Sequence, residues 1–198
     1  MPLRQAPYDL IAARWARDRA ASSFREKPYI DRLRAPLPAG ARILDLGFGT
    51  GRPIGRYLLD RGFRLTGVDA SQEMLRLGAA NCPEAELVWA DLLDYQPTRT
   101  FDAVIAWDSV FHISKDRHAA LFRSIHEWLE PNGGLLISLG GSEDEFTDLM
   151  YGVEFFYSAH APDASVALLR AAGFDIVLAE IDDPTSRGHL AILGRKLG

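Results

Sequence analysis

The amino-acid sequence predicts an α/β fold, a doubly wound sheet of seven mostly parallel strands with an antiparallel edge strand and N-terminal helices. Three observations predict this class. Apolar runs of strand length alternate with segments in which apolar residues recur at every third or fourth position. A glycine-rich turn follows the first apolar run. The last two apolar runs are separated by a short connection rich in turn-forming residues, which suits an antiparallel pair.

The middle of the chain carries the strands that we expect to be parallel. They are Arg42–Leu46, Arg64–Val68, Glu86–Trp89, Phe101–Trp107 and Gly134–Leu139. Helical patterns between them occupy Pro53–Arg61, Ser71–Asn81 and Lys115–Leu129. Because parallel strands need crossover connections, we expect these helices to cover the sheet.

The last third of the chain departs from this alternation. Pro162–Ala172 has a helical pattern that ends at Gly173, and two strands follow it, Phe174–Ile181 and His189–Arg195. The connection 182–188 is too short for a crossover helix, so we expect a hairpin with antiparallel strands.

The residues before the first strand contain two helical patterns, Asp9–Ala21 and Phe24–Leu33. Their aromatic side chains either close over the glycine-rich turn or pack on the sheet and its helices; they are Tyr8, Trp15, Phe24 and Tyr29.

Length and composition limit the possible functions. The 198 residues fit one domain, and the longest apolar runs are too short for a membrane span. A net charge of −5 gives no overall attraction to nucleic acid. Cys82 is the only cysteine, and residues 1–9 lack the apolar core of a secretory signal, so we expect a cytoplasmic protein without disulfides. No metal-binding motif is present, so we expect no metal site.

The glycine-rich turn favours a ligand with a cationic end. Its glycines, Gly47, Gly49 and Gly51, allow a close approach of the backbone to a ligand. A dinucleotide fingerprint would require glycine at Arg52, and the phosphate-binding loop that ends in Lys-Ser/Thr is absent. Asp45, at the mouth of the turn, would repel a pyrophosphate but attract an ammonium or a sulfonium.

Two further carboxylates follow the next two strands. Asp69 ends the second strand, where a carboxylate can accept hydrogen bonds from both ribose hydroxyls; alternatively, Asp69 or Ser71 caps the following helix. Asp91 follows the third strand, where it can accept from an exocyclic amine while the Leu92 amide donates; alternatively, Asp91 is a simple turn residue. Strand ends of this kind line the crevice in which open α/β sheets bind ligands.

These motifs, in this order, resemble those of the class I S-adenosylmethionine-dependent methyltransferases, which have a Rossmann-like fold. The segment from Asp45 to Gly51 resembles their glycine motif, and Phe101–Trp107 resembles their fourth strand. The resemblance implies S-adenosyl-L-methionine as cofactor. The cofactor-binding residues that it implies are Asp45, Gly47, Gly49, Gly51, Asp69, Ala70, Asp91, Leu92, Ala106 and Trp107. Phe48 departs from the family, in which small residues or cysteine are usual, and we expect it to alter packing beside the cofactor without abolishing binding.

The resemblance also implies where the methyl acceptor binds. The segment after the fourth strand should form the floor of its pocket, with Asp108 and Phe111, and the segment before the last helix should form a lid, with Tyr157 and His160. His112 is the catalytic candidate, as a base or as a polar contact that orients the acceptor; alternatively, it is simply buried. His189 is interpreted as an edge-strand residue outside the site.

We therefore predict one methyltransferase domain over residues 1–198, with a helical cap (1–40), a cofactor-binding core (41–140) and a lid segment followed by a helix and a strand hairpin (141–198). The expected reaction is methyl transfer to a small molecule, without nucleic-acid or membrane partners. Two alternatives are a protein that binds the cofactor as a sensor or scaffold and a nicotinamide-dependent oxidoreductase.

Overall fold

The computed structural model describes residues 6–183 and 188–197. Its strands are β1 Arg42–Leu46, β2 Arg64–Asp69, β3 Glu86–Trp89, β4 Phe101–Ala106, β5 Leu129–Gly140, β6 Asp144–Met150, β7 Val153–Ala159, β8 Phe174–Asp183 and β9 His189–Lys196. Its helices are α1 Pro7–Ala21, α2 Lys27–Arg34, α3 Ile54–Leu59, α4 Gln72–Asn81, α5 Lys115–Trp128 and α6 Pro162–Ala171, with a 3₁₀ turn, η1, at Val110–His112. Most of the predicted elements are present within a few residues of their expected ends.

The main sheet confirms the predicted fold class. Its strand order is β3-β2-β1-β4-β5-β9-β8, and the first five of these strands pair in parallel. Strand β9 pairs antiparallel with both β5 and β8, so the antiparallel strand lies inside the sheet and β8 forms its edge. Of the predicted connection 182–188, residues 184–187 lie outside the described residues, as do residues 1–5 of the predicted cap.

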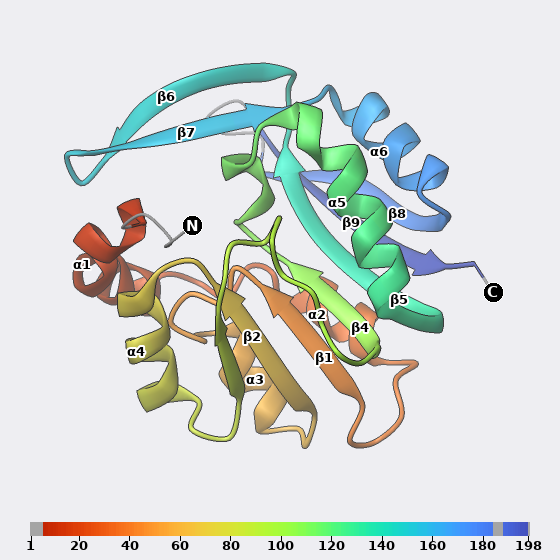
Figure 1. Ribbon diagram of the computed structural model, residues 1–198, viewed down its shortest axis with the longest axis horizontal. Coiled ribbons are helices and arrows are strands. Elements are labelled where there is room, and N and C mark those ends of the chain that lie inside the picture. Colours follow the sequence, from red (N-terminus) through yellow and green to blue (C-terminus); the bar gives the residue numbers. More distant parts are fainter. Residues whose placement is uncertain (1–5, 184–187, 198) are drawn as a thin grey trace.

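Helices cover the two faces of the sheet (Figure 1). Ile43 of β1 belongs to one core cluster, with Leu33 of α2 and Leu58 of α3. Its neighbour Leu44 belongs to the other cluster, with Phe122 of α5. Because successive side chains of a strand point to opposite faces, the apolar run of β1 supplies both cores at once.

Prolines set the beginnings of several helices. Pro28 lies in the first turn of α2, which therefore begins at Lys27, later than the predicted Phe24. Pro53, expected inside a helix, takes the N-cap position, and α3 begins at Ile54. Ser71, placed at the start of a helical pattern and also considered as its cap, is the N-cap of α4, where its hydroxyl accepts a hydrogen bond from the Met74 amide at 3.1 Å.

The hairpin of β6 and β7 was not predicted. The two strands pair antiparallel around Tyr151 and Gly152, which both have positive φ (55° and 83°), as the tight turns of hairpins require. Most side chains of β6 are at least partly exposed, so its sequence lacks a clear apolar alternation. Figure 1 shows the hairpin reaching from the end of β5 toward α1.

Helix α1 connects the two sides of the molecule. Near its start, the Asp9 carboxylate accepts hydrogen bonds from the Ser71 hydroxyl (2.6 Å) and the Glu73 amide (3.1 Å) at the beginning of α4. Near its end, Asp18 accepts a hydrogen bond from the Tyr151 hydroxyl at the hairpin turn (2.5 Å). Helix α1 therefore lies between α4 and the hairpin (Figure 1).

Candidate active site

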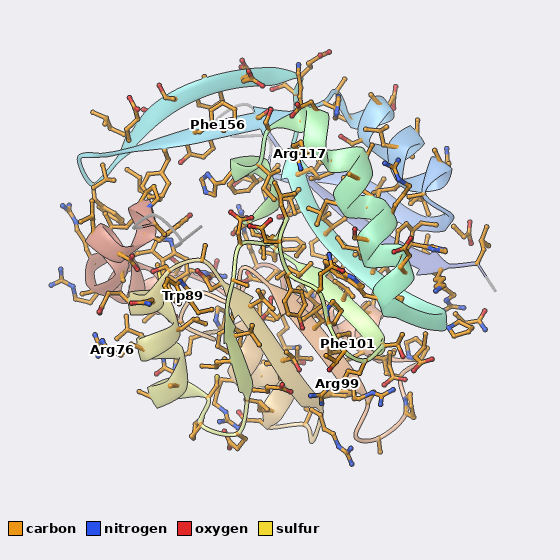
Figure 2. All side chains as sticks on the ribbon, viewed as in Figure 1. Arg76, Trp89, Arg99, Phe101, Arg117 and Phe156 are labelled. Atoms are coloured by element: carbon orange, nitrogen blue, oxygen red, sulfur yellow. The ribbon has the colours of Figure 1, made fainter. Side chains whose placement is uncertain are left out.

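A cavity of about 340 Å³ lies at the carboxyl ends of the parallel strands. Its walls come from the glycine-rich turn, the ends of β2 and β4, helix α1 and strand β7. Phe156 of β7 lines the cavity, and it lies at the opposite end of the sheet from Phe101, where β4 begins (Figure 2). Open α/β sheets bind their ligands at this end.

The glycine-rich turn is held in a conformation that favours glycine. Gly47, Gly49 and Gly51 have φ values of 84°, 56° and 70°. A Cβ atom on Gly47 would lie 2.3 Å from Cβ of Ser109, and one on Gly49 would touch Trp15 of α1 at 3.7 Å. The turn is therefore closely enclosed, and all three predicted glycines line the cavity.

Phe48 fills a space that glycines leave beneath the turn. Its side chain is 5% exposed. A Cβ atom added to Gly51, Gly55, Gly67 or Gly78 would lie 2.5 to 2.9 Å from its nearest ring atoms. The bulky residue that departs from the family pattern is thus accommodated by missing side chains in β2, α3 and α4.

Asp69 is tied to the turn on one side and to α4 on the other. Its Oδ2 accepts a hydrogen bond from the Gly49 amide at 2.7 Å, and its Oδ1 accepts one from the Ser71 amide at 2.8 Å. Burial raises the pKa of Asp69, although these amide bonds oppose the shift. The side-chain cap of α4 comes from Ser71, and Asp69 faces the cavity.

Asp45 is buried at the bottom of the same cavity. Among the described residues its carboxylate has no hydrogen-bond partner, and its exposure is only 4%. Burial, followed by the charge of Asp69, raises the pKa of Asp45 to about 7. A cationic group of a ligand would restore the favourable environment that this carboxylate lacks.

Asp91 and Leu92 line the cavity beyond β3, and Ala70 lines it beyond β2. Asp91 also makes the turn that the alternative interpretation expected, since its Oδ1 accepts a hydrogen bond from the Leu93 amide at 2.9 Å. Ala106 is buried at the end of β4, and the next residue, Trp107, reaches the cavity wall.

The far side of the cavity holds a hydrogen-bonded pair, Tyr8 and His112. Nδ1 of His112 lies 2.8 Å from the Phe156 carbonyl oxygen, which can only accept, so Nδ1 carries the proton. Nε2 of His112 is then an acceptor, and the Tyr8 hydroxyl donates to it at 3.0 Å. Burial lowers the pKa of His112, although the Phe156 carbonyl opposes the shift, and burial, followed by nearby charges, raises the pKa of Tyr8. Both groups are therefore neutral near pH 7.

Of the remaining predicted residues, three line one or both of two cavities and His160 lines neither. Asp108 borders the first cavity and also a second one of about 410 Å³ beneath the hairpin, which Phe111 and Tyr157 line. His160 lines neither of these cavities, and its Nε2 lies 2.9 Å from the Lys115 carbonyl oxygen. His189, interpreted as lying outside the site, is bonded to Asp108 instead.

The four aromatic residues of the N-terminal cap divide between the two predicted positions, over the glycine-rich turn or against the sheet and its helices. Tyr8 and Trp15 line the first cavity, whereas Phe24 packs on Tyr57 with ring centroids 5.2 Å apart and Tyr29 stacks on Trp107 at 5.6 Å. The cavity also has walls that sequence reasoning missed, among them Arg19, Phe155 and Phe156. These residues lie in segments that carry no recognisable motif.

Within residues 6–183 and 188–197, no group of three or more His, Cys, Asp or Glu side chains is arranged to hold a metal ion. In the same part of the chain, every helix is too short or too polar to cross a membrane.

Relatives of the sequence are methyltransferases. A family model described as a methyltransferase domain matches residues 43–133. Phosphoethanolamine N-methyltransferase 1 of Triticum aestivum is 31% identical over an alignment of 185 positions, and the alignment covers 87% of this chain and 35% of that protein. Trans-aconitate 2-methyltransferase of Azoarcus sp. (strain BH72) is 35% identical over 114 residues, 57% of this chain and 44% of that protein. The chain spans about a third of the length of the first of these relatives.

A solved structure of a small-molecule methyltransferase has the same fold. The 1,6-didemethyltoxoflavin-N1-methyltransferase of Burkholderia thailandensis superposes with a TM-score of 0.72 and is 25% identical, covering 100% of this chain and 93% of that one. Its crystal structure contains 1,6-didemethyltoxoflavin and S-adenosylhomocysteine.

Proposed function

Because the chain belongs to the class I S-adenosylmethionine-dependent methyltransferases, we propose that it transfers a methyl group from S-adenosyl-L-methionine to a small-molecule acceptor. One observation carries this proposal. The glycine-rich turn and three carboxylates, Asp45, Asp69 and Asp91, line one cavity that continues to the neutral pair of Tyr8 and His112.

We assign the cofactor to the strand-end side of this cavity. Asp69 would hold the ribose, and Asp91 with the Leu92 amide would hold the adenine. Asp45 would face the ammonium group, and the backbone around Ala106 and Trp107 would contact the methionine end. The partnerless, buried carboxylate of Asp45 supports this assignment, because it needs a cation that the described residues do not provide. When bound, the cofactor supplies an activated methyl group.

We assign the acceptor to the opposite side. The Phe156 carbonyl fixes the tautomer of His112 in which Nε2 is an acceptor, and Nε2 accepts from the Tyr8 hydroxyl. A methyl acceptor that takes the place of this hydroxyl can donate a hydrogen bond or a proton to Nε2. The aromatic walls exclude water, which favours a reaction whose main requirement is alignment. The named acceptors of the wheat and Burkholderia relatives are small molecules, which supports a small acceptor here. We further propose one domain with its cap, core and lid segments, in the cytoplasm.

Ligand-dependent thermal unfolding tests the cofactor class. S-adenosylhomocysteine at about 100 times its Kd should stabilise the folded protein by about 2.7 kcal/mol, whereas NADH should have no effect. Stabilisation by NADH alone would favour the oxidoreductase. Incubation with methyl-labelled cofactor and a metabolite extract then tests turnover, and stabilisation without any labelled product would favour a sensor or scaffold.

The affinity for S-adenosylhomocysteine should rise about tenfold between pH 6 and pH 8. The free Asp45 carboxyl, with its pKa at about 7, is mostly protonated at pH 6. A bound ammonium favours the carboxylate, so binding below pH 7 releases a proton and becomes tighter as pH rises. Calorimetry in buffers of different ionisation enthalpy measures the released proton. The Asp45→Asn variant should lose most of this dependence, and an unchanged profile in that variant would contradict the assignment.

His112→Ala should reduce turnover while leaving the affinity for S-adenosylhomocysteine nearly normal. A loss of about 10²-fold is the scale expected when a general base is removed. Turnover is measured as label transferred to the active fraction of the extract, and affinity by calorimetry. His126→Ala, in the following helix α5 and outside both cavities, is the matched control. Equal turnover in wild type and His112→Ala would make His112 a purely structural residue.

A further inference from the structure

Among the described residues, Asp108 is the one that lines both the first and the second cavity. Asp108 follows β4 and has a positive φ of 54°, unusual for a residue other than glycine. Its amide donates to the Ser138 hydroxyl of β5 at 2.7 Å, and its Oδ1 accepts from Nε2 of His189 at 2.9 Å. Its side chain is 37% exposed, and Oδ2 has no partner among the described residues. One oxygen of Asp108 is thus fixed by protein and the other is available to a ligand.

His189 holds the Asp108 carboxylate in place through a hydrogen bond. Its Nε2 faces Asp108 and its Nδ1 makes a very short contact with the Asp182 carboxylate. A doubly protonated, cationic ring can donate to both carboxylates at once, and this form of His189 fits its position between Asp108 and Asp182. Burial lowers the pKa of His189, but the hydrogen bonds and charges of Asp108 and Asp182 outweigh burial and raise it. The Trp107 ring contacts the imidazole at a tilt of 59°, with centroids 5.1 Å apart.

The second cavity combines aromatic walls with an excess of carboxylates. Tyr157 stacks on Phe146 at 5.1 Å and on Phe111 at 5.9 Å. The cations that line this cavity, Arg25 and His189, are both already engaged with carboxylates, Arg25 with Asp183 at 2.6 Å. Four carboxylates line the cavity, those of Asp108, Asp144, Asp148 and Asp183, so among the described lining residues the acids outnumber the two cations. Burial, followed by the charge of Asp148, raises the pKa of Tyr157.

We propose that this second cavity binds the body of the methyl acceptor, that the acceptor carries an amino group which donates to Oδ2 of Asp108, and that His189 is the positioning residue that holds Asp108 for this contact. The proposal rests on the proposed function, because the junction at Asp108 matters only if the first cavity holds the cofactor. A negative, aromatic cavity favours an organic amine over an anion. The carboxylate accepts the N–H hydrogen bond that selects the amine and orients it toward the first cavity.

Benzylamine is a suitable probe, because it joins an aromatic ring to an amino group. Calorimetry with protein saturated with S-adenosylhomocysteine should detect benzylamine binding, with benzoate binding at least about tenfold more weakly. Asp108→Asn should weaken benzylamine about tenfold or more, and His189→Gln by a smaller factor. Asp163→Asn, which removes an equal charge on the exposed first turn of α6, should change nothing. Absence of benzylamine binding, equal binding of benzoate or an unaffected Asp108→Asn variant would each overturn the proposal.

Nuclear magnetic resonance of ¹⁵N-labelled histidine measures the protonation state of each imidazole ring. A purely structural role of His189 would not require its ring to be charged. The chain has five histidines, and His189 should remain doubly protonated to a higher pH than His112, His118 and His126, whose pKa values burial lowers. Asp182→Asn should lower the pKa of His189 and weaken benzylamine binding together. A neutral His189 at pH 7 in the wild type would refute its positioning role.

These measurements distinguish a failure of the proposed function from a failure of the acceptor proposal. If wild-type protein does not bind S-adenosylhomocysteine, the proposed function fails. If it binds S-adenosylhomocysteine normally in the wild type and in His189→Gln, but benzylamine binding is absent or insensitive to Asp108, only the acceptor proposal fails.

Discussion

Phe48→Ala is expected to lower the free energy of unfolding by about 3–5 kcal/mol, the usual cost of removing a buried aromatic ring. The ring fills the space between β2, α3 and α4 beneath the glycine-rich turn. Urea unfolding followed by circular dichroism measures the change. Because the same ring supports the turn, the affinity for S-adenosylhomocysteine should fall as well. A change below about 1 kcal/mol would show that the site collapses around the missing ring.

A second substitution isolates the contact between Phe48 and its glycine neighbours. A Cβ atom on Gly67 would lie 2.5 Å from Cγ of Phe48, so Gly67→Ala should destabilise wild type by about 1–3 kcal/mol. In the Phe48→Ala background this cost should largely disappear, giving a favourable coupling energy in the double-mutant cycle. Gly194→Ala in β9 is the matched control, since its Cβ would meet no described atom closer than 3.5 Å. Additive effects of Phe48→Ala and Gly67→Ala would contradict this explanation of Phe48.

Asp69→Ala is expected to weaken S-adenosylhomocysteine binding at least tenfold, or about 1.4 kcal/mol. The substitution removes the carboxylate proposed to hold the ribose. It also releases the Gly49 and Ser71 amides, which Asp69 holds at 2.7 and 2.8 Å, so the glycine-rich turn loses a fixed point. Calorimetry measures the affinity, and Asp163→Ala on α6 is the control.

An analogue of S-adenosylhomocysteine without ribose hydroxyls separates these two losses. Wild type should bind the analogue more weakly than the natural compound, because the hydroxyls no longer reach Asp69. Asp69→Ala should bind both compounds with similar affinity. If the variant still distinguishes them as wild type does, another group holds the ribose.

The main sheet could be predicted from the sequence, because its strands supply apolar side chains to a hydrophobic core on each face of the sheet. Strands such as β1 are buried on both faces, and this leaves a continuous apolar signal. Strand β6 leaves no such signal, because residues such as Asp148 and Leu149 are exposed and each residue of the strand is at least partly accessible to solvent. The pair β6–β7 therefore had to be seen in the structure.

The residues of the candidate site likewise fall into those that the sequence could predict and those that it could not. Asp45, Asp69 and Asp91 could be expected to meet, because adjacent parallel strands end at one edge. The contact of Tyr8 with His112 joins residues 104 positions apart, and no local pattern encodes it. His189 was interpreted as an edge residue, but β9 lies between β5 and β8, which brings its first residue next to Asp108.

Helix α1 contributes to both halves of the first cavity. Asp9 fixes it to the beginning of α4, directly after the proposed ribose site, while Tyr8 reaches His112 on the acceptor side. Because Tyr8 and Asp9 are adjacent, a cofactor that favours this position of α1 also favours the position of Tyr8 that the acceptor meets. We therefore expect cofactor and acceptor to bind with positive cooperativity, each raising the affinity for the other by the same factor.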